Sequence, residues 1–265
     1  MLQPKLLAVT SVRNARELGG YVGWQGRLLK PGRLVRSGKL NRLTAKDAAY
    51  LRSYGLTTVI DLRTSGEIKR EPDLLWPGVA TKSISISSQE VGHVSKDLAE
   101  TKKRFASDQY AGFKHMCYLY REFITNEYSR HGLAQFLKAA AQNTEGTLLF
   151  HCSEGKDRTG ICAVLLLWAL GVDWDTIRED YLYSNFLLAD YRKGVEHAGQ
   201  AKGESVEMTA SMRSLASVAN EYLDTALLTI RREYGTMTAF FKKGLGLDQA
   251  FLDDLRTNYL GESND

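Results

Sequence analysis

A short polar segment between two apolar stretches contains residues whose types and spacing could carry out nucleophilic chemistry on an anion. It reads His-Cys-Ser-Glu-Gly-Lys-Asp-Arg-Thr-Gly over residues 151–160. A strand-like run precedes it and a helix-like run follows it, so the pattern predicts a tight loop that ends at a helix N-terminus. The unpaired backbone N–H groups of such a loop and the positive end of the helix dipole bind anions. Gly155 permits the backbone conformation that this loop needs.

Cys152 and Arg158 are the two residues of this segment on which such a reaction would depend. A cysteine at the start of an anion-binding loop lies in a field that favours the nucleophilic thiolate. The guanidinium of Arg158 can hold two phosphate oxygens as a fork, which a lysine cannot do. Neither Cys117 nor Cys162 has an arginine six positions later. We therefore expect Cys152 to be the nucleophile.

The elements that must position this loop are a strand before it and an apolar helix after it. The run Thr147–Phe150 is short and apolar, which suits a buried strand. A second buried strand is expected over Leu56–Ile60, because most of its residues are β-branched. Thr44 is a suitable N-cap for a helix over 45–54, and Gly55 follows where that helix would end.

Strand signals occur only early in the chain, and its last third is helical in pattern. Residues 81–86 alternate between polar and apolar, as in a half-exposed strand. The polar stretch 87–108 fits either a surface helix or a mobile insert. Apolar residues three and four apart predict helices over 110–126 and 132–142, and the pattern of 173–260 is helical throughout. These elements indicate an α/β domain whose C-terminal third is a helical layer.

No internal repeat, low-complexity tract or linker divides the chain, so residues 1–265 are expected to form a single domain. Small polar residues at 198–207, between two helical segments, predict a hinge or the tip of a lid. We expect four parts within the domain: an irregular N-terminal segment with short extended pieces at 1–43, the sheet core and phosphate-binding loop at 44–172, the helical layer at 173–265, and within that layer a lid at 186–215 over the cysteine.

Composition and charge limit the class of protein. The 265 residues are 43% hydrophobic and 25% charged, which is usual for a folded globular chain. The net charge of +4 favours anionic ligands, but no concentrated basic stripe indicates a nucleic-acid partner. The longest apolar run, 161–172, is shorter than the roughly 20 residues that span a bilayer, so only peripheral contact with a membrane is expected. The N-terminus lacks a signal-peptide pattern, so we expect a cytoplasmic protein, and export would need a signal that this chain does not show.

The cysteines and histidines show no spacing that is typical of a metal site. The three cysteines form no C-x-x-C pair, and the five histidines are scattered along the chain. Three cysteines cannot pair completely, which also disfavours a disulfide scaffold. We therefore expect no metal and no cofactor. Cys162 lies in an apolar run and is expected to be a core residue.

The segment 151–160 resembles the H-C-x5-R-[ST]-G signature of cysteine-dependent protein tyrosine phosphatases. Its Gly-Lys-Asp-Arg-Thr-Gly form is similar to that of the atypical bacterial tyrosine/serine phosphatases, which also act on phosphoinositides. The resemblance covers about residues 13–260, and 87–108 match least. Further motifs that resemble this family are Asn14–Gly20, Arg36-Ser37, Val59–Arg63 with Glu67, Asp180–Leu182 with Ser184-Asn185, Tyr222-Leu223 and Tyr234-Gly235. The sequence departs from the family at Glu17, where Asp is usual, and at Glu154, where a small residue is common.

The resemblance implies a cysteine-phosphatase-like α/β fold, with a central, mostly parallel sheet flanked by helices, and a reaction that is independent of metal. Cys152 would attack phosphorus, Arg158 and the loop amides would hold the other oxygens, and water would hydrolyse the cysteinyl-phosphate. The loop residues expected to contact the substrate or its phosphate are Ser153, Glu154, Gly155, Lys156 and Thr159. The residues expected to support the loop are His151, Asp61, Arg63 and Arg36.

The leaving oxygen needs a proton, and two aspartates are candidates for the general acid. Trp76-Pro77-Gly78 lacks the aspartate of the mobile W-P-D loop that supplies this proton in many tyrosine phosphatases. The resemblance to the Lys-Asp-Arg group implies that Asp157 is the acid. In the alternative interpretation Asp157 is a structural buttress, salt-bridged to Arg36 or Arg63. Asp61 would then be the next candidate for the acid.

Three other residues of the segment have more than one interpretation. Lys156 would face a substrate group beyond the reacting phosphate, which suits an inositol ring with further phosphates, or it is simply a solvated lysine. Thr159 would donate a hydrogen bond to the thiolate or cap the helix. His151 is expected to brace the loop rather than to act as a base, because successive side chains at a strand end point to opposite sides.

Three functions are compatible with this segment. The first is a phosphomonoester hydrolase that acts on phosphotyrosine, with phosphoserine or phosphothreonine proteins and phosphoinositides as further substrates. The second is a catalytically weak module that binds phosphorylated ligands, since the anion site would persist without a working acid. The third is a rhodanese-like sulfurtransferase, whose loop cysteine also precedes a helix but whose loop does not require the Arg-Thr-Gly ending.

Overall fold

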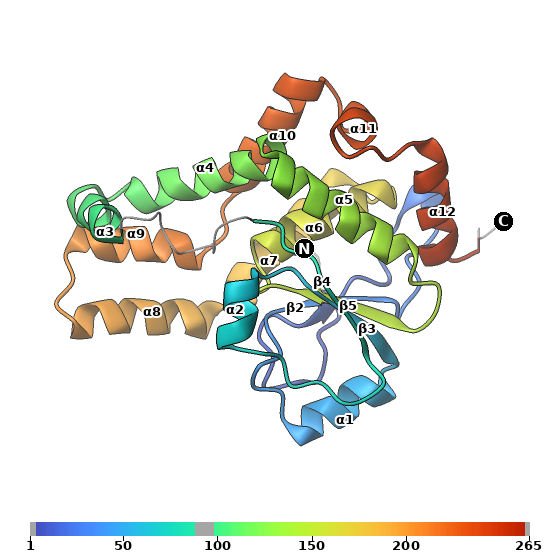
Figure 1. Ribbon diagram of the computed structural model, residues 1–265, viewed down its shortest axis with the longest axis horizontal. Helices are drawn as coiled ribbons and strands as arrows, with labels where there is room; N and C mark the ends of the chain where they lie inside the picture. Colours follow the sequence, from blue (N-terminus) through green and yellow to red (C-terminus); the bar gives the residue numbers. More distant parts are fainter. Residues whose placement is uncertain (1–3, 88–97, 263–265) are drawn as a thin grey trace.

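The computed structural model describes residues 4–87 and 98–262, which form a central sheet with helices on both of its faces (Figure 1). The sheet has five strands in the order β1-β2-β5-β3-β4. β1 pairs with β2 in antiparallel orientation, and the other neighbours are parallel. The strands are β1 Arg16–Glu17, β2 Leu34–Ser37, β3 Leu56–Asp61, β4 Ala80–Ser83 and β5 Thr147–His151. The predicted α/β class with a mostly parallel sheet is confirmed.

The central strand β5 packs against a different hydrophobic core on each face of the sheet. Leu148 and Phe150 belong to a large core formed with α4, α5, α6, α10 and α12, whereas Leu149 belongs to a smaller core formed with α1. This alternation follows from the two-residue period of a strand. The helices that precede and follow β5 are α1 Ala45–Ser53, α2 Ser65–Arg70, α3 Leu98–Ser107, α4 Ala111–Thr125, α5 Glu127–Ala141 and α6 Arg158–Ala169.

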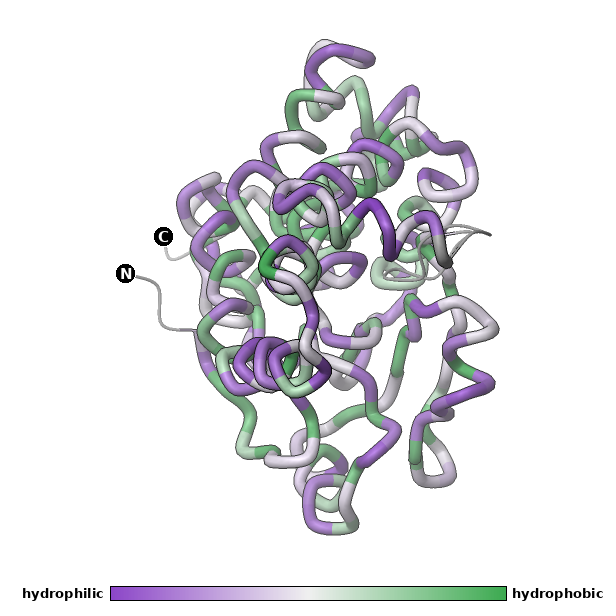
Figure 2. Tube along the Cα trace, turned by 90° about the vertical axis from the view of Figure 1, so that its left-hand side faces the viewer, coloured by the Kyte–Doolittle hydropathy of each residue, from purple (hydrophilic) through white to green (hydrophobic). Residues whose placement is uncertain are grey.

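The chain after α6 is helical throughout, as predicted. Hydrophobic and hydrophilic residues alternate along the helical parts of the trace (Figure 2), as in helices with one buried side. The turn between α8 and α9 falls in the predicted hinge at 198–207, and Gly203 there has φ +66°. The later helices are α7 Trp174–Leu187, α8 Ala189–Ala201, α9 Val206–Ala216, α10 Asn220–Tyr234, α11 Met237–Ala239, a π-helical turn Phe240–Gly244 and α12 Gln249–Tyr259.

Local signals place the first half of the sheet correctly. The backbone N–H of Asp47 donates to Thr44 Oγ1 at 3.2 Å, which caps α1 as predicted. Gly55 ends this helix with φ +91°, and β3 begins at the next residue. The strand that was predicted over 81–86 as half-exposed spans only Ala80–Ser83 and forms the edge of the sheet as β4. All four of its residues are exposed, and the buried Ile84 and Ile86 follow its end.

Two predictions about the chain before β5 need correction. The segment 1–43, expected to be irregular, contributes β1 and β2, besides a 3-10 turn at Trp24–Gly26, so the sheet core does not begin at residue 44. β2 lacks the apolar pattern of a buried strand because it contains Arg36, a charged residue that is fully buried in an ion pair with Asp180. Within the polar stretch 87–108, residues 98–107 form the helix α3, and residues 88–97 lie outside the described part of the chain.

Among the described residues, no helix is both long enough and apolar enough to cross a membrane. The apolar run 161–172 instead forms most of α6, which packs inside the large core.

Candidate active site

The segment 151–160 runs from the last residue of β5 through the connecting loop, residues 152–157, into the first turn of α6. Cys152 starts the loop and is only 3% exposed, and Arg158 is the first residue of α6. Gly155 has φ +71°, and a Cβ there would collide with the backbone of Ser37. The loop is therefore packed too closely against the end of β2 to accept any residue but glycine, as the sequence predicts.

Two side chains from the start of the chain hold the loop by its carbonyl groups. Arg36 Nη2 donates to the carbonyl oxygen of Gly155 at 3.0 Å, and Asn14 Nδ2 donates to the same oxygen at 2.9 Å. Because these contacts fix the carbonyl group of Gly155 on one side of the loop, we expect the backbone N–H groups of the loop to face a bound anion on the other side. Asn14 itself adopts the left-handed conformation, with φ +57°. Arg36 thus supports the loop, as predicted.

Asp180 on α7 fixes the two buried arginines of this support. Its Oδ1 accepts from Arg16 Nε at 2.8 Å, and its Oδ2 lies 2.5 Å from Arg36 Nη1. Tyr21 also donates to Oδ1, at 3.2 Å. Burial alone would raise the pKa of Asp180, but the two guanidinium groups lower it below its usual range. The carboxylate therefore stays ionised between two cations in a site closed to water.

Arg158 is held in a forked geometry by Glu67. Its Nη1 and Nη2 lie 2.6 and 2.7 Å from the two carboxylate oxygens, and Ser153 Oγ donates to Glu67 Oε1 at 2.7 Å. Glu67 is fixed in turn by a capping box at the start of α2, where Thr64 Oγ1 accepts from its backbone N–H. One carboxylate thus orients both a cation and a hydroxyl of the loop.

The ion pair between Glu67 and Arg158 shifts the pKa values of the two side chains in opposite directions. Burial alone would raise the pKa of Glu67, but the hydrogen bonds and charge of Arg158 lower it to about 2. Burial alone would lower the pKa of Arg158, but Glu67 and the Cys152 sulfur raise it above its usual range. Arg158 is therefore a permanent cation that interacts electrostatically with the proposed nucleophile.

This pair predicts a loss of stability in acid. Because the pKa of Glu67 is lower in the folded chain than its usual 4.5, its contribution is complete above that value and is lost as pH falls towards 2. The difference in unfolding free energy between wild type and Glu67→Gln should be about 3 kcal/mol at pH 6 and less than half of that at pH 3. Urea unfolding at both pH values measures this difference.

The exposed residue Glu145 provides the control, because Glu145→Gln should show no such change. A difference between wild type and Glu67→Gln that does not vary with pH would contradict the assignment.

Asp157 lies between a lysine and a buried tyrosine. Lys156 Nζ is 2.5 Å from Asp157 Oδ2, and Tyr120 donates to Oδ1 at 3.2 Å. Tyr181 donates in turn to the Tyr120 hydroxyl at 2.8 Å. Lys156 also donates to the carbonyl oxygen of Ser217 at 3.3 Å and is only 4% exposed, so the solvated-lysine alternative is wrong.

The alternative role of Asp157 as a buttress of Arg36 or Arg63 is also wrong. Arg36 pairs with Asp180, and Arg63 pairs with Asp61 at 2.7 Å and with Asp73 at 3.1 Å. Arg63 thus donates to both carboxylate oxygens of Asp61, which suits a structural role for this aspartate.

His151 braces the loop from behind. Its Nε2 lies 3.0 Å from Asp73 Oδ2, and its Nδ1 lies 3.1 Å from the carbonyl oxygen of Cys152. Burial alone would lower the pKa of His151, but Asp73 and Asp61 raise it above its usual range. Asp61, Asp73 and His151 are close enough to ligate one cation, but the Arg63 guanidinium already bridges the two carboxylates. No sequence spacing could reveal this group, because its members come from three separate segments.

A cavity of about 200 Å³ opens above Cys152 and the loop. Its polar side is the loop itself, including Ser153, Glu154, Lys156, Asp157 and Arg158. Its apolar side comes from helices α4, α8 and α9, namely Met116, Tyr191, Val195, Met212, Leu215 and Ala216. Most of this wall belongs to the segment 186–215, which was expected to form a lid. That it moves to admit substrate stays a prediction.

Two loop residues differ from expectation. Glu154 lines the cavity, but its carboxylate pairs with Arg13 at 3.0 Å. Thr159 is fully buried, and its hydroxyl has no hydrogen-bond partner among the described residues. The predicted bond to the Cys152 sulfur is therefore absent, and Thr159 does not cap the helix because it is the second residue of α6, after the cap position at Asp157. Cys162 is fully buried in the core, as expected, and burial raises its pKa.

Several residues that shape the site were not among the predicted site residues. Glu67 could have been found, because Thr64-Ser-Gly-Glu67 is a capping-box pattern and Glu67 lies in a motif that resembles the family. Tyr120 carries no such signal. The residues that the structure adds are Asn14, Arg16, Glu67, Asp73, Tyr120 and Asp180.

The chain is similar over nearly its whole length to known phosphatases. The model of a family described as the tyrosine phosphatase family matches residues 7–261. A Cupriavidus necator protein named as a tyrosine-protein phosphatase is 34% identical over 255 residues, which cover 96% of this chain and 88% of that protein. PtpB of Mycobacterium tuberculosis, named a triple specificity protein phosphatase, is 31% identical in an alignment 268 positions long that covers 88% of this chain and 92% of PtpB.

Proposed function

This chain belongs to the tyrosine phosphatase family, and we propose that it removes phosphate from phosphotyrosine side chains through a cysteinyl-phosphate intermediate on Cys152. The observation that carries this proposal is the loop geometry. Cys152 and Arg158 line the same cavity, and the Arg158 guanidinium is fixed by Glu67 at Nη1 and Nη2, while its Nε has no hydrogen-bond partner among the described residues. A nucleophile beside a fixed cation and oriented amides is what transfer of a phosphoryl group requires.

The shape of the cavity supports phosphotyrosine as the main substrate. Its wall opposite the loop is apolar and includes Met116, Met212 and Leu215. Such a wall suits the flat ring of an arylphosphate better than a polar inositol ring. Activity on phosphoserine, phosphothreonine or phosphoinositides remains a further proposal, supported by the similarity to a relative named for triple specificity.

The reaction would proceed in two displacements. The Cys152 thiolate attacks phosphorus, the bond to the tyrosine oxygen breaks, and Asp157 gives its proton to that oxygen. Water then attacks the cysteinyl-phosphate, which releases phosphate and restores the thiolate, and the Asp157 carboxylate accepts the proton of the water. Before substrate binds, Asp157 is paired with Lys156. We propose that the incoming phosphate attracts Lys156 away from Asp157.

Trapping the intermediate tests the function directly. Phosphotyrosine peptide, phosphoserine peptide and monophosphorylated phosphoinositide are each incubated with the protein in reductant and a chelator. We expect phosphate release to be fastest with the phosphotyrosine peptide. After acid quenching, mass spectrometry should find one phosphate on the peptide that carries Cys152. Cys117 and Cys162 are internal controls that should stay unmodified.

Other outcomes would overturn the proposal. Binding of these ligands without any turnover from pH 5 to 8 would favour the phospho-ligand-binding module. Transfer of sulfur from thiosulfate to cyanide in place of phosphate release would favour the sulfurtransferase.

Replacing Asp157 by asparagine tests the proposed acid. Asparagine cannot give a proton, so kcat for phosphotyrosine should fall about 10²-fold or more and the alkaline limb of the pH–rate profile should flatten. The loss should be much smaller with para-nitrophenyl phosphate, because its leaving group departs without a proton. Asp175→Asn, on the exposed side of α7, is the matched control. Equal losses with both substrates would transfer the acid role from Asp157 to Asp61 or water.

A further inference from the structure

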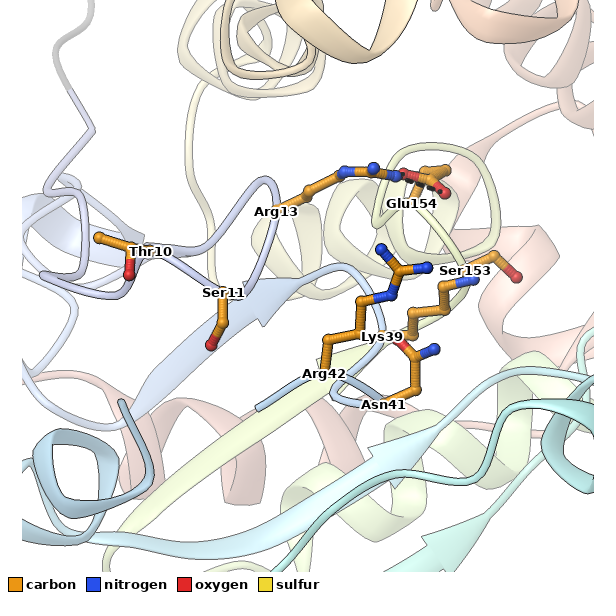
Figure 3. Close-up of a pocket in the computed structure, with 8 residues that line it drawn as sticks. All are labelled: Thr10, Ser11, Arg13, Lys39, Asn41, Arg42, Ser153 and Glu154. Atoms are coloured by element: carbon orange, nitrogen blue, oxygen red, sulfur yellow. Dashed lines mark hydrogen bonds and ion pairs between the residues drawn. The ribbon is translucent and has the colours of Figure 1, made fainter. Parts of the chain in front are cut away.

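A second cavity, of about 340 Å³, adjoins the catalytic cavity and shares Ser153 and Glu154 with it (Figure 3). We call it the basic pocket, because its other lining residues include Arg13, Lys39, Asn41 and Arg42. In Figure 3 the side chains of Arg13, Lys39 and Arg42 extend towards the side of the pocket formed by Ser153 and Glu154. The reaction proposed above uses none of these three cations.

The charges of the basic pocket do not cancel. Arg13 pairs with Glu154 at 3.0 Å, and Lys39 pairs with Glu71 at 2.5 Å. Arg42 is exposed and forms no ion pair with any residue in the described part of the chain. Glu154 and Glu71 thus offset two of the three cations, and the remaining positive charge, that of Arg42, would attract an anion.

The position of Glu154 makes the basic pocket an extension of the catalytic one. Glu154 lines both cavities, and its carboxylate holds the Arg13 guanidinium at the boundary between them. Arg13 also lies over the ring of Tyr191 in the apolar wall, 5.0 Å from its centroid. A ligand that occupies the catalytic cavity and continues past Glu154 would thus meet Arg13 first and Arg42 next.

We propose that the basic pocket binds an acidic side chain of the peptide that carries the phosphotyrosine, and so selects substrates with Asp or Glu beside the phosphorylated residue. This inference rests on the proposed function. The apolar wall of the catalytic cavity favours an aromatic ring at the scissile phosphate, and an extended peptide places neighbouring side chains within reach of an adjoining cavity. The incoming carboxylate would compete with Glu154 for Arg13 and pair with the exposed Arg42.

The test compares two phosphotyrosine peptides that differ only in flanking residues, Asp and Glu in one and Asn and Gln in the other. We expect kcat/KM to be about three- to fivefold higher for the acidic peptide, as a few partly exposed ion pairs allow. The ratio of kcat/KM for the acidic peptide to kcat/KM for the neutral peptide should fall towards one in Arg42→Ala and below one in Arg42→Glu. In wild type this ratio should also decrease in high salt. Glu154→Gln should raise it, because Arg13 is then released from its internal partner. Arg232→Ala, on the exposed surface of α10, is the matched control and should leave the ratio unchanged.

The outcomes separate this inference from the proposed function. Turnover of both peptides at equal rates would overturn the inference and leave the function standing. No turnover of either peptide would overturn the function. A third outcome would assign the basic pocket to a lipid headgroup and contradict its assignment to a peptide side chain. In that outcome the two peptides have equal kcat/KM, but a bisphosphorylated phosphoinositide is hydrolysed faster than a monophosphorylated one, and Arg42→Glu removes that preference.

Discussion

Replacing Cys152 by serine is expected to abolish phosphate release while binding of phosphotyrosine peptide is retained. A serine hydroxyl has nearly the same size as the thiol but is not ionised near neutral pH, so it cannot attack phosphorus at a useful rate. Loss of the nucleophile should lower kcat by about 10⁴-fold or more. The position of the Arg158 guanidinium does not depend on the Cys152 sulfur, because Glu67 and Ser153 accept its hydrogen bonds. Phosphate release and calorimetric titration with the peptide measure the two effects.

The other two cysteines provide the controls for this change. Cys117 is half-buried on α4, outside the loop, so Cys117→Ser should keep full turnover. Cys162 lies in the core of α6, so Cys162→Ser affects stability before activity. Turnover by Cys152→Ser above a few per cent of wild type would mean that another group attacks the phosphate. Loss of peptide binding in this variant would show instead that the sulfur itself holds the ligand.

The residues that were predicted from the sequence are those whose signals lie close together along the chain. Cys152, Gly155 and Arg158 occupy one loop between a strand and a helix, and the structure builds that loop as expected. The cap of α1 by Thr44 and the turn at Gly55 were predictable for the same reason. Local spacing is enough to define a loop and its glycine, because the relevant backbone contacts are made within a few residues.

The residues that were missed act across large separations in sequence. Glu67 reaches Arg158 over 91 positions, and Asp180 reaches Arg36 over 144. A buried charge is stable only beside its partner, and a single sequence does not show which charges will meet. The charged Arg36 therefore made β2 look like part of an irregular segment, since charged residues are rare in buried strands. Lys156 was open to two interpretations for a similar reason, because its burial depends on Ser217, far along the chain.

Replacing Asp180 by asparagine is expected to cause the largest loss of stability among these variants. The substitution keeps the shape but removes the charge that two fully buried guanidinium groups share, Arg16 at 2.8 Å and Arg36 at 2.5 Å. Removing one partner of a buried ion pair leaves an uncompensated charge and costs about 3–5 kcal/mol. Urea denaturation at pH 7 measures the change. Asp175→Asn, on the exposed side of the same helix, should change the unfolding free energy by less than about 0.5 kcal/mol.

The Asp180 variant also tests whether the arginine support is connected to the active site. Arg36 donates to the carbonyl oxygen of Gly155, so a displaced Arg36 should loosen the loop that orients phosphate. We therefore expect kcat/KM to fall about tenfold at a temperature where the variant is still folded, because misplaced amides stabilise the transition state less. A destabilised variant with unchanged kcat/KM would show that Asn14 alone holds the loop. A loss of less than 1 kcal/mol would show instead that the two arginines do not need the Asp180 charge.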